Sequence, residues 1–382
     1  MRAIINANIV LETGIIWNGT ILTDGDEIVA FGKDVEIPEN AEIIDANGSY
    51  VGPGFVDVHV HGINGFHTAL QPVEAAEYFL KHGETTILAT PAYHFNKEEM
   101  LECIRTLKEN LDKAPNIRGL YMEGPYTNPE YGSHAYCNPW RHGVHVEDYI
   151  DIVDEAGDLA KVWTVAPELE GIKGFVEYAR KVNPNAIIAV GHSHATPDMI
   201  RALGSKYRPK ILTHMGCATP VLPPLSGGTR GAGPDEYFMQ NPDTYCELIS
   251  DSCAIHVNPD IQKLLIHAKG VERVILITDS TEYIMENPPQ YAHIDDLNFD
   301  EEGGLAGSKM TLDKACRNVM TSTNCGIAQA FIMASTTPAK AINMYDEIGS
   351  VEVGKKADLV FVDDRFNVKK VMLRGELKEE IQ

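Results

Sequence analysis

The sequence predicts an α/β protein, a (β/α)8 or TIM barrel joined to a small discontinuous β-sandwich domain built from both termini. Three observations predict this fold class. The middle of the 382-residue chain alternates eight short apolar runs with helix-like segments. Both ends consist instead of strand-like runs separated by turn signals. Histidines and carboxylates follow several of the apolar runs, as catalytic groups do in such barrels.

The two ends of the chain have the same β-rich texture. In residues 1–51, turn dipeptides such as Asn18-Gly19 and Asp24-Gly25 separate strand-like runs at 3–11, 14–22, 27–32 and 42–45. In residues 346–382 such runs lie at 350–354, 357–362 and 368–373. Each end alone has too few strands to bury a face. We therefore expect the ends to pair into one domain, with residues 52–345 forming the barrel between them.

The barrel region contains eight candidate strands, each a short apolar run. They lie at 54–60, 85–90, 117–122, 162–166, 186–190, 210–213, 245–250 and 274–278. Helix-compatible stretches alternate with them, at 73–82, 97–113, 146–157, 172–181, 197–203 and 259–269. Catalytic groups are expected where the strands end.

The composition and charge of the chain argue against several classes of protein. Lys and Arg total 32 against 55 Asp and Glu, a formal charge of −23, which argues against non-specific binding to nucleic acid or anionic membranes. No secretory leader pattern opens the chain, and nowhere do about 18 apolar residues run together. The seven cysteines form no Cys-x-x-Cys pair, so neither a disulfide framework nor a thiolate zinc site is indicated. We expect a soluble cytoplasmic protein with no nucleic-acid or membrane partner.

The chain is organised around His59 and His61, one residue apart at the end of the first barrel strand. Side chains alternate faces along a strand, so both imidazoles project the same way and can hold one cation. Burying two imidazoles without a partner would be costly, which favours metal binding over a purely structural role.

Ligand-type residues follow other strands. Glu123, His192 and His214 follow the third, fifth and sixth strands, and Asp279 follows the eighth. Imidazole and carboxylate without thiolate suit zinc, iron(II) or a similar divalent ion. We predict one or two divalent ions, with zinc as first choice and iron or manganese as alternatives. A lone histidine after a strand is more often a hydrogen-bonded structural residue, an interpretation that applies to His82, His94, His142, His145, His267 and His293. His194 is expected to point away from the site.

Several of these residues lie in segments that resemble the sequence motifs of a known family. The run from Pro53 to His61 resembles the opening motif of the amidohydrolase superfamily, and 357–360 resembles the end of its small β-domain. More specific segments, in collinear order, resemble the N-acetylglucosamine-6-phosphate deacetylase family: Met122-Glu123-Gly124-Pro125, Gly132-Ser133-His134, Gly191-His192-Ser193, Thr213-His214, Thr278-Asp279 and Leu305-Ala306-Gly307-Ser308.

The resemblance implies a role for each residue. Glu123, His192 and His214 would hold the metal that all members share, while His59 and His61 would hold a second ion. Asp279 would transfer protons, and His134 would steady the carbonyl oxygen. The implied substrate-binding residues are Cys217, Ala218, Arg230 and His256. The implied reaction is hydrolysis of N-acetylglucosamine-6-phosphate to glucosamine-6-phosphate and acetate. In this family an arginine, matched here by Arg230, reaches a neighbouring subunit. The resemblance therefore implies a homodimer.

The chain departs from the family pattern on the substrate side. Cys217 stands where the family has asparagine, and the stretch 251–256 is two residues longer than usual. A different N-acetyl hexosamine, such as N-acetylgalactosamine-6-phosphate, therefore stays open as substrate. Another N-acyl or cyclic amide is a further alternative, although the end of the fourth strand reads Val165-Ala166-Pro167-Glu168, without the lysine that bridges metals in many cyclic-amide hydrolases. A catalytically silent, sugar-phosphate-binding barrel is disfavoured because Asp279 is present.

Overall fold

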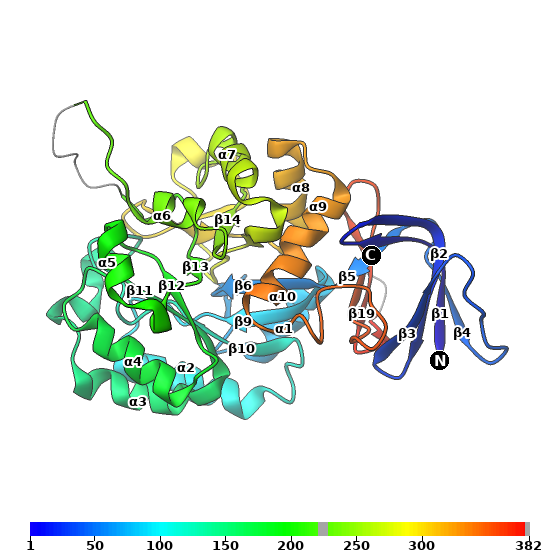
Figure 1. The fold of residues 1–382 in the computed structure, drawn as a ribbon, viewed down its shortest axis with the longest axis horizontal. Helices are drawn as coiled ribbons and strands as arrows, with labels where there is room; N and C mark the ends of the chain where they lie inside the picture. The colour runs from blue at the N-terminus through cyan, green and yellow to red at the C-terminus, as the bar shows by residue number, and fades with distance from the viewer. Residues whose placement is uncertain (221–227, 379–382) are drawn as a thin grey trace.

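The computed structural model describes residues 1–220 and 228–378 and is dominated by two eight-stranded sheets (Figure 1). One sheet is parallel and has the strand order β15-β14-β13-β12-β11-β10-β9-β6. Its strands are β6 (Phe55–Val60), β9 (Glu84–Ala89), β10 (Ile117–Met122), β11 (Ala160–Val165), β12 (Ile187–Val190), β13 (Ile211–Leu212), β14 (Tyr245–Ile249) and β15 (Val274–Ile277). They lie at the eight positions that the apolar runs predict.

The first and last strands of this sheet meet at their carboxyl ends. The backbone N–H of Asp279 donates to the carbonyl of His59 at 3.1 Å, and the N–H of His61 donates to the carbonyl of Ser280 at 2.8 Å. These bonds close the sheet into a barrel. The predicted (β/α)8 architecture is confirmed.

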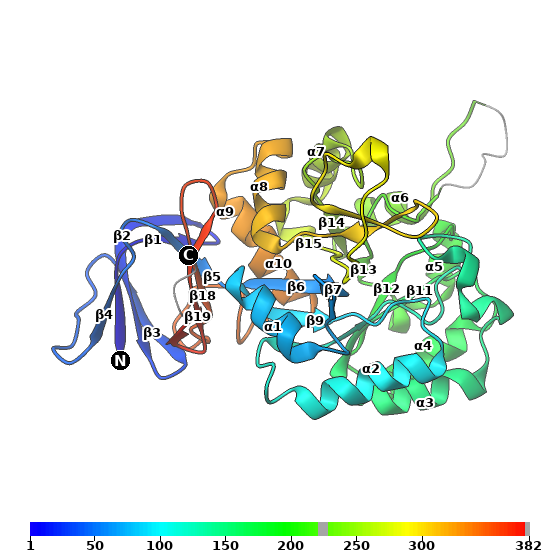
Figure 2. The same cartoon turned by 180° about the vertical axis from the view of Figure 1, so that it is seen from behind.

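Helices cover the outside of the barrel (Figures 1 and 2). They are α1 (Pro72–Lys81), α2 (Lys97–Asn110), α3 (Val146–Ala156), α4 (Ile172–Val182), α5 (Pro197–Ala202), α6 (Pro234–Gln240), α7 (Pro259–Lys269), α8 (Leu312–Thr323), α9 (Ile327–Phe331) and α10 (Thr337–Ala341). In α4, Ile172, Phe175, Val176 and Ala179 are buried, the spacing of one helix face turned toward the sheet. No helix in these described ranges has both the length and the apolar character needed to span a membrane.

Strands from both ends of the chain form the second sheet, here called the terminal sheet. Its strands are β1 (Arg2–Leu11), β2 (Gly14–Asp24), β3 (Glu27–Gly32), β4 (Glu42–Asp45), β5 (Tyr50–Pro53), β18 (Leu359–Val362), β19 (Val368–Leu373) and β20 (Glu376–Leu377). β1 pairs with β4 through residues 2–5 and with β5 through residues 8–9. The change of partner coincides with Asn6, whose φ is 54°. The predicted boundary between residues 51 and 52 falls inside β5, and the boundaries stay a prediction.

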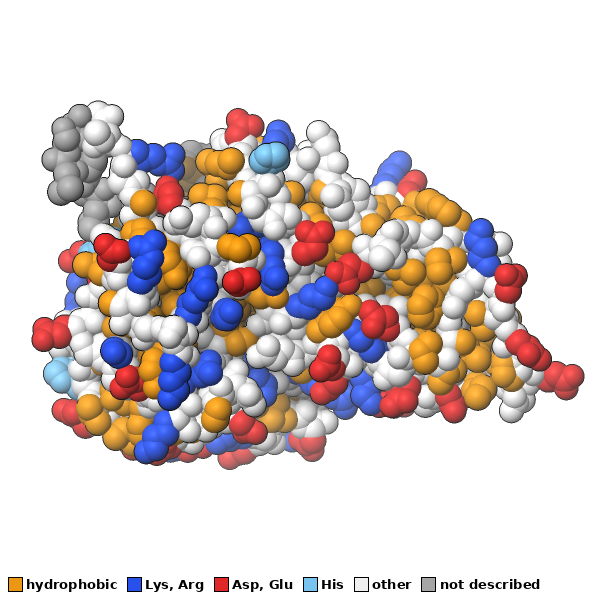
Figure 3. Space-filling model, viewed as in Figure 1, with side chains coloured by type: hydrophobic (Ala, Val, Ile, Leu, Met, Phe, Trp, Pro, Cys, Tyr) orange, Lys and Arg blue, Asp and Glu red, His pale blue; other side chains and the backbone are white. Residues whose placement is uncertain are grey.

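An aromatic cluster joins the terminal sheet to the barrel. The ring of Phe331 packs against Phe55 and Phe366, with centroids 5.6 and 5.1 Å away. A Cβ at Gly52 would lie 2.4 Å from the Phe331 ring, so only glycine lets β5 approach α9 this closely. Figure 3 shows hydrophobic side chains gathered over the end of the molecule that the terminal sheet forms. Large exposed hydrophobic residues near the two ends of the chain include Trp17, Ile43 and Val353, at 54%, 51% and 63%.

Two small hairpins lie beside the barrel mouth. They are β7 (Gly62–Ile63) with β8 (Phe66–His67), and β16 (Leu297–Phe299) with β17 (Leu305–Ser308). The N–H of Ser308 donates to the carbonyl of Asp279 at 2.8 Å. The second hairpin therefore supports the segment that follows β15.

Candidate active site

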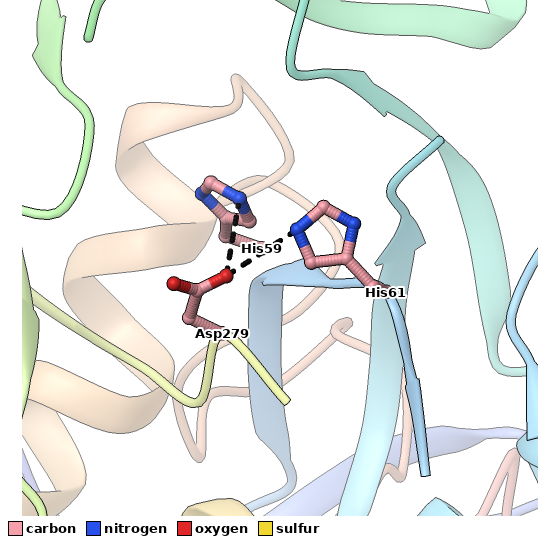
Figure 4. A group of neighbouring side chains, drawn as sticks. All are labelled: His59, His61 and Asp279. Carbon is pink, nitrogen blue, oxygen red and sulfur yellow. Dashed lines mark ion pairs between the residues drawn. The ribbon is translucent and has the colours of Figure 1, made fainter. Parts of the chain in front are cut away.

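Six of the predicted site residues converge where the barrel strands end. They fall into two groups, and within each group the potential ligand atoms lie within 4.8 Å of one another. His59, His61 and Asp279 make the first group, drawn in Figure 4, here called the β6 group because His59 lies in that strand and His61 follows it. Glu123, His192 and His214 make the second, here called the β10 group after the strand that precedes Glu123.

The carboxylate of Glu123 touches both groups. Its Oε1 lies 2.9 Å from the Nε2 atoms of His192 and His214, and its Oε2 lies 3.2 Å from the Nε2 of His61. Two divalent ions about 3.5–4 Å apart are commonly bridged by such a shared group. The position of Glu123 suits a bridging ligand.

Backbone carbonyls orient three of the imidazoles. The Nδ1 atoms of His61, His192 and His214 face the carbonyl oxygens of Thr90, Tyr131 and Cys217 at 3.0, 3.0 and 3.2 Å. A carbonyl only accepts, so in the neutral imidazole each Nδ1 carries the hydrogen and each Nε2 presents its lone pair to the site. This is the tautomer that a metal ligand requires.

The backbone is strained where it aims these side chains. His192, His214 and Asp279 have φ angles of 44°, 29° and 47°, and His134 has 55°. Residues with a Cβ rarely adopt such angles, and when they do they cluster at functional sites. Gly132 is also required next to His192, because a Cβ there would lie 2.4 Å from the imidazole.

Asp279 completes the β6 group. Its Oδ1 lies 3.3 Å from the Nε2 of His61 and 3.6 Å from the Nε2 of His59, as the dashed lines of Figure 4 mark. Its side chain is 13% exposed, whereas that of His59 is fully buried below it. Asp279 is therefore the carboxylate of this group that faces the cavity.

The buried charges shift one another's pKa values. Burial raises the pKa of Glu123, but the charges of His59 and His192 outweigh it and lower that pKa well below its usual value. Burial lowers the pKa of His61, but the neighbouring carboxylates of Asp279 and Glu123 raise it to about 9. Without metal, these shifts favour an ionised Glu123 and a protonated His61, and a divalent ion would displace the proton of His61.

The residues present fit a divalent cation. The donor set is nitrogen and oxygen without sulfur. The Nε2 of His59 and the Oε2 of Glu123 are buried in the described structure without a hydrogen-bond partner. Buried polar atoms usually have partners, and a divalent cation would supply one to each of these two atoms.

A cavity of about 320 Å³ opens above these residues. Cys217, Ala218 and His256, three of the residues predicted to bind substrate, lie in its wall. Arg230 is not a lining residue, since its side chain is 80% exposed and pairs with Glu236 at 2.6 Å. Among the lining residues that the structure describes, none is Lys or Arg.

The predicted oxyanion donor lies at the edge of the cavity. Gly132 and Ser133 line the cavity, and His134 follows them directly. The His134 ring stacks on His94, with centroids 4.4 Å apart, and His94 is itself a lining residue. The catalytic role of His134 stays a prediction.

Comparison with known proteins decides the family. The model of the amidohydrolase family matches residues 50–378 of the chain. The chain belongs to the amidohydrolase family. It is 26% identical to the N-acetylglucosamine-6-phosphate deacetylase of Haemophilus influenzae, over 99% of both chains. It is 28% identical to the N-acetylgalactosamine-6-phosphate deacetylase of Shewanella, over 85% of this chain and 82% of that one.

A solved amidohydrolase has the same fold. The crystal structure of N-acetylglucosamine-6-phosphate deacetylase from Pasteurella multocida superposes with a TM-score of 0.84 at 26% identity. The match covers 99% of this chain and 100% of that one. The two-sheet architecture is therefore shared over the whole length of both proteins.

Several residues of this amidohydrolase site were not singled out from the sequence. His94, interpreted as structural, lines the cavity together with Tyr93 and Tyr283. All three lie in loops after strands, where no periodic pattern marks them. Glu247 was also missed, although a carboxylate between Cys246 and Leu248 inside a buried strand is itself a signal. His194, which was left out, pairs through Nδ1 with the Tyr131 hydroxyl at 2.8 Å and is not a lining residue.

Proposed function

We propose that the protein is a metal-dependent deacetylase that hydrolyses the N-acetyl group of an amino sugar phosphate. The proposed reaction converts N-acetylglucosamine-6-phosphate and water to glucosamine-6-phosphate and acetate. The observation that carries the proposal is the position of Asp279, 3.3 Å from His61 on the cavity wall and on the same rim as the β10 group. The names of the relatives from Haemophilus influenzae and Pasteurella multocida support the substrate.

The β10 group would hold the ion that the reaction needs, and His59 with His61 would hold a second. Zinc is the first choice because it takes imidazole and carboxylate ligands readily, and iron or manganese accept the same set. Such an ion, when bound, lowers the pKa of water to about 7 and polarises the acyl oxygen.

The chain's own groups would move the protons. The carboxylate of Asp279 takes the proton of the attacking water and delivers it to the amide nitrogen that leaves as an amine. Acid/base groups of this kind contribute roughly 10²- to 10⁴-fold to the rate. Burial lowers the pKa of His134, which keeps this imidazole neutral and able to donate one hydrogen bond to the acyl oxygen.

The phosphate would need a cation from outside the described cavity wall. The guanidinium of Arg230 is 80% exposed and is a cation that a neighbouring copy can receive. We infer a homodimer in which Arg230 of one copy approaches the substrate of the other. A phosphorylated substrate also suits the predicted cytoplasmic location, which stays a prediction.

N-Acetylgalactosamine-6-phosphate is the second candidate substrate. The Shewanella relative, named for that activity, is 28% identical to this chain. Cys217 and the segment around His256, where the chain departs from the family pattern, lie in the cavity wall. Both departures therefore lie where they would contact the sugar rather than the metal.

An acetate-release assay tests the proposal. Protein with counted metals would be given N-acetylglucosamine, N-acetylgalactosamine and N-acetylmannosamine, each with and without the 6-phosphate. We expect release from a 6-phosphate, fastest with the glucosamine form. Faster release from the galactosamine form would select the second candidate. Metal-loaded protein that releases acetate from none of the six would contradict the proposal.

A further inference from the structure

Glu247 is a buried carboxylate inside the barrel that the proposed mechanism does not use. It lies on β14, and its side chain is fully buried. Its neighbours Cys246 and Leu248 are hydrophobic and belong to the core. An ionised group in such surroundings is strongly destabilising unless partners compensate for its lost hydration. The buried position of Glu247 therefore indicates a functional role for this carboxylate.

One oxygen of Glu247 connects the two ligand groups. Its Oε2 accepts a hydrogen bond from the Nδ1 of His59 at 3.1 Å and another from the backbone N–H of His214 at 3.1 Å. The ring of Tyr121 stacks on His59 at 4.5 Å and restricts its rotation from the side. His59 belongs to the β6 group and His214 to the β10 group.

The contact fixes which nitrogen of His59 is available. An ionised carboxylate only accepts, so the Nδ1 of His59 carries the hydrogen. The Nε2 lone pair then faces Glu123 Oε1 and Asp279 Oδ1, each 3.6 Å away. The other ligand imidazoles have neutral carbonyls as partners, whereas His59 has a charged one. A carboxylate partner makes an imidazole a more basic ligand and holds its orientation.

We propose that Glu247 is a positioning residue that sets the affinity of the β6 group for a divalent ion. It does so by orienting His59 and by adding a negative charge beneath the site. The carboxylates of Glu123, Glu247 and Asp279 surround four imidazoles. One divalent ion would leave one of these three negative charges uncompensated inside the barrel, and a second ion would bring two positive charges, more than enough to compensate it. The inference rests on the metal dependence in the proposed function and extends it to two ions per chain.

Two substitutions at the same position test the role. Glu247→Gln has nearly the same shape and keeps one oxygen as acceptor, but loses the charge. Glu247→Leu removes the acceptor as well and suits the apolar surroundings. The matched control is Glu84→Gln, because Glu84 is also fully buried in the barrel. One of its oxygens accepts from the N–H of Leu312 at 2.8 Å, and the other has no partner.

The measurement is metal affinity, made by titrating metal-free protein with Mn²⁺ and recording the electron paramagnetic resonance spectrum. Two ions bound a few ångströms apart give a spin-coupled spectrum, and a single ion gives an uncoupled one. Loss of such an orienting partner typically weakens binding by 10- to 100-fold. We expect Glu247→Gln to weaken one of two ions by about tenfold and Glu247→Leu by about 100-fold. The remaining ion and the Glu84→Gln variant should be unchanged.

Two outcomes would overturn the proposal. The first is Glu247→Leu with both ions at wild-type affinity. The second is equal weakening of both ions in both Glu247 variants, which would indicate a general loss of structure instead of control of one site. Thermal unfolding of the metal-free variants identifies a folding defect separately.

The titration does not depend on any substrate, so its failure differs from failure of the proposed function. Wild-type protein that deacetylates a sugar phosphate while Glu247→Leu keeps both ions defeats only the role of Glu247. Wild-type protein that binds two ions through Glu247 yet deacetylates no amino sugar defeats only the substrate assignment.

Discussion

The barrel mouth and the terminal sheet use left-handed backbone in different ways. Within residues 1–53, the non-glycine residues with positive φ are Asn6, Asn18 and Asn47. Asparagine tolerates this conformation and is common in turns. At the barrel mouth the corresponding residues include the functional candidates His192 and Asp279. In the terminal sheet, which also has Phe366 and Arg374 in this conformation, left-handed residues lie at turns and at register shifts between strands, whereas at the mouth they orient side chains.

The two regions also differ in what they bury. The interior of the terminal sheet is made of residues such as Ile4, Ile9 and Phe361. The mouth buries carboxylates and imidazoles that only a cation or substrate would fully satisfy. The comparison indicates that the residues of the mouth serve catalysis at a cost in folding stability, whereas the residues of the terminal sheet stabilise the protein. Substitutions in the two regions should therefore affect different measurements.

Asp279→Asn should have the largest effect. It keeps the shape of the side chain but removes the proton acceptor, so kcat should fall by roughly 10²- to 10⁴-fold. The ion of the β10 group should remain, because Asp279 is not one of its members. Acetate release and metal content, measured on the same sample, check both statements. Activity that survives with full metal content would show that another residue carries the proton.

Ile9→Ala should lower the stability of the protein and leave catalysis unchanged. Ile9 is fully buried in the core of the terminal sheet, away from the cavity wall. Truncating a buried isoleucine costs about 2–5 kcal/mol in the free energy of unfolding. We expect urea unfolding to show this loss while kcat per folded molecule stays at the wild-type value. A large fall in kcat would mean that the terminal sheet positions the site and would remove the contrast between the regions.

Gly132→Ala should weaken metal binding by displacing a ligand side chain. The new Cβ would lie 2.4 Å from the His192 ring, at a φ of 95°. Displacing one ligand should weaken the ion of the β10 group by about 10- to 100-fold. Gly326→Ala is the control, because φ is −82° there and nothing lies within 4 Å of the added atom. Equal metal affinity in both variants would show that His192 adjusts freely.

Much of this arrangement was predictable from the sequence because it depends on local patterns. Eight apolar runs of strand length predicted the barrel. The rule that catalytic groups follow parallel strands predicted that the ligands lie at one rim. His59 and His61 are informative because alternation along one strand already places them on the same face. No knowledge of distant contacts is needed for that step.

Contacts between distant segments could not be predicted in the same way. Glu247 and His59 are 188 residues apart, and their hydrogen bond depends on the register of β14 and β6 around the closed barrel. His94 looked structural because it lies in a loop without a pattern, and only the fold brings it beside His134. The accessibility of Arg230 likewise depends on packing, and its predicted contact with substrate requires a second copy of the chain.

Asp235→Asn should give the smallest effect and a clear pH signature. Asp235, half-buried in the first turn of α6, accepts a hydrogen bond from Thr219 at 2.9 Å, yet burial raises its pKa from 3.8 to about 6. The protonated form is thus favoured in the folded state, so stability is lost as pH rises from about 4 to about 6 and stays lower above that.

Asparagine avoids this cost and keeps an acceptor for Thr219. The full pKa shift would correspond to about 3 kcal/mol, and solvent access to the half-buried carboxyl reduces the expected gain at pH 7 to about 1 kcal/mol. Urea unfolding at pH 4 and pH 7 should show a gain only at the higher pH. An equal change at both pH values would mean that packing, not charge, sets the stability of this wall, and that the mouth does not bury charge at the expense of stability there.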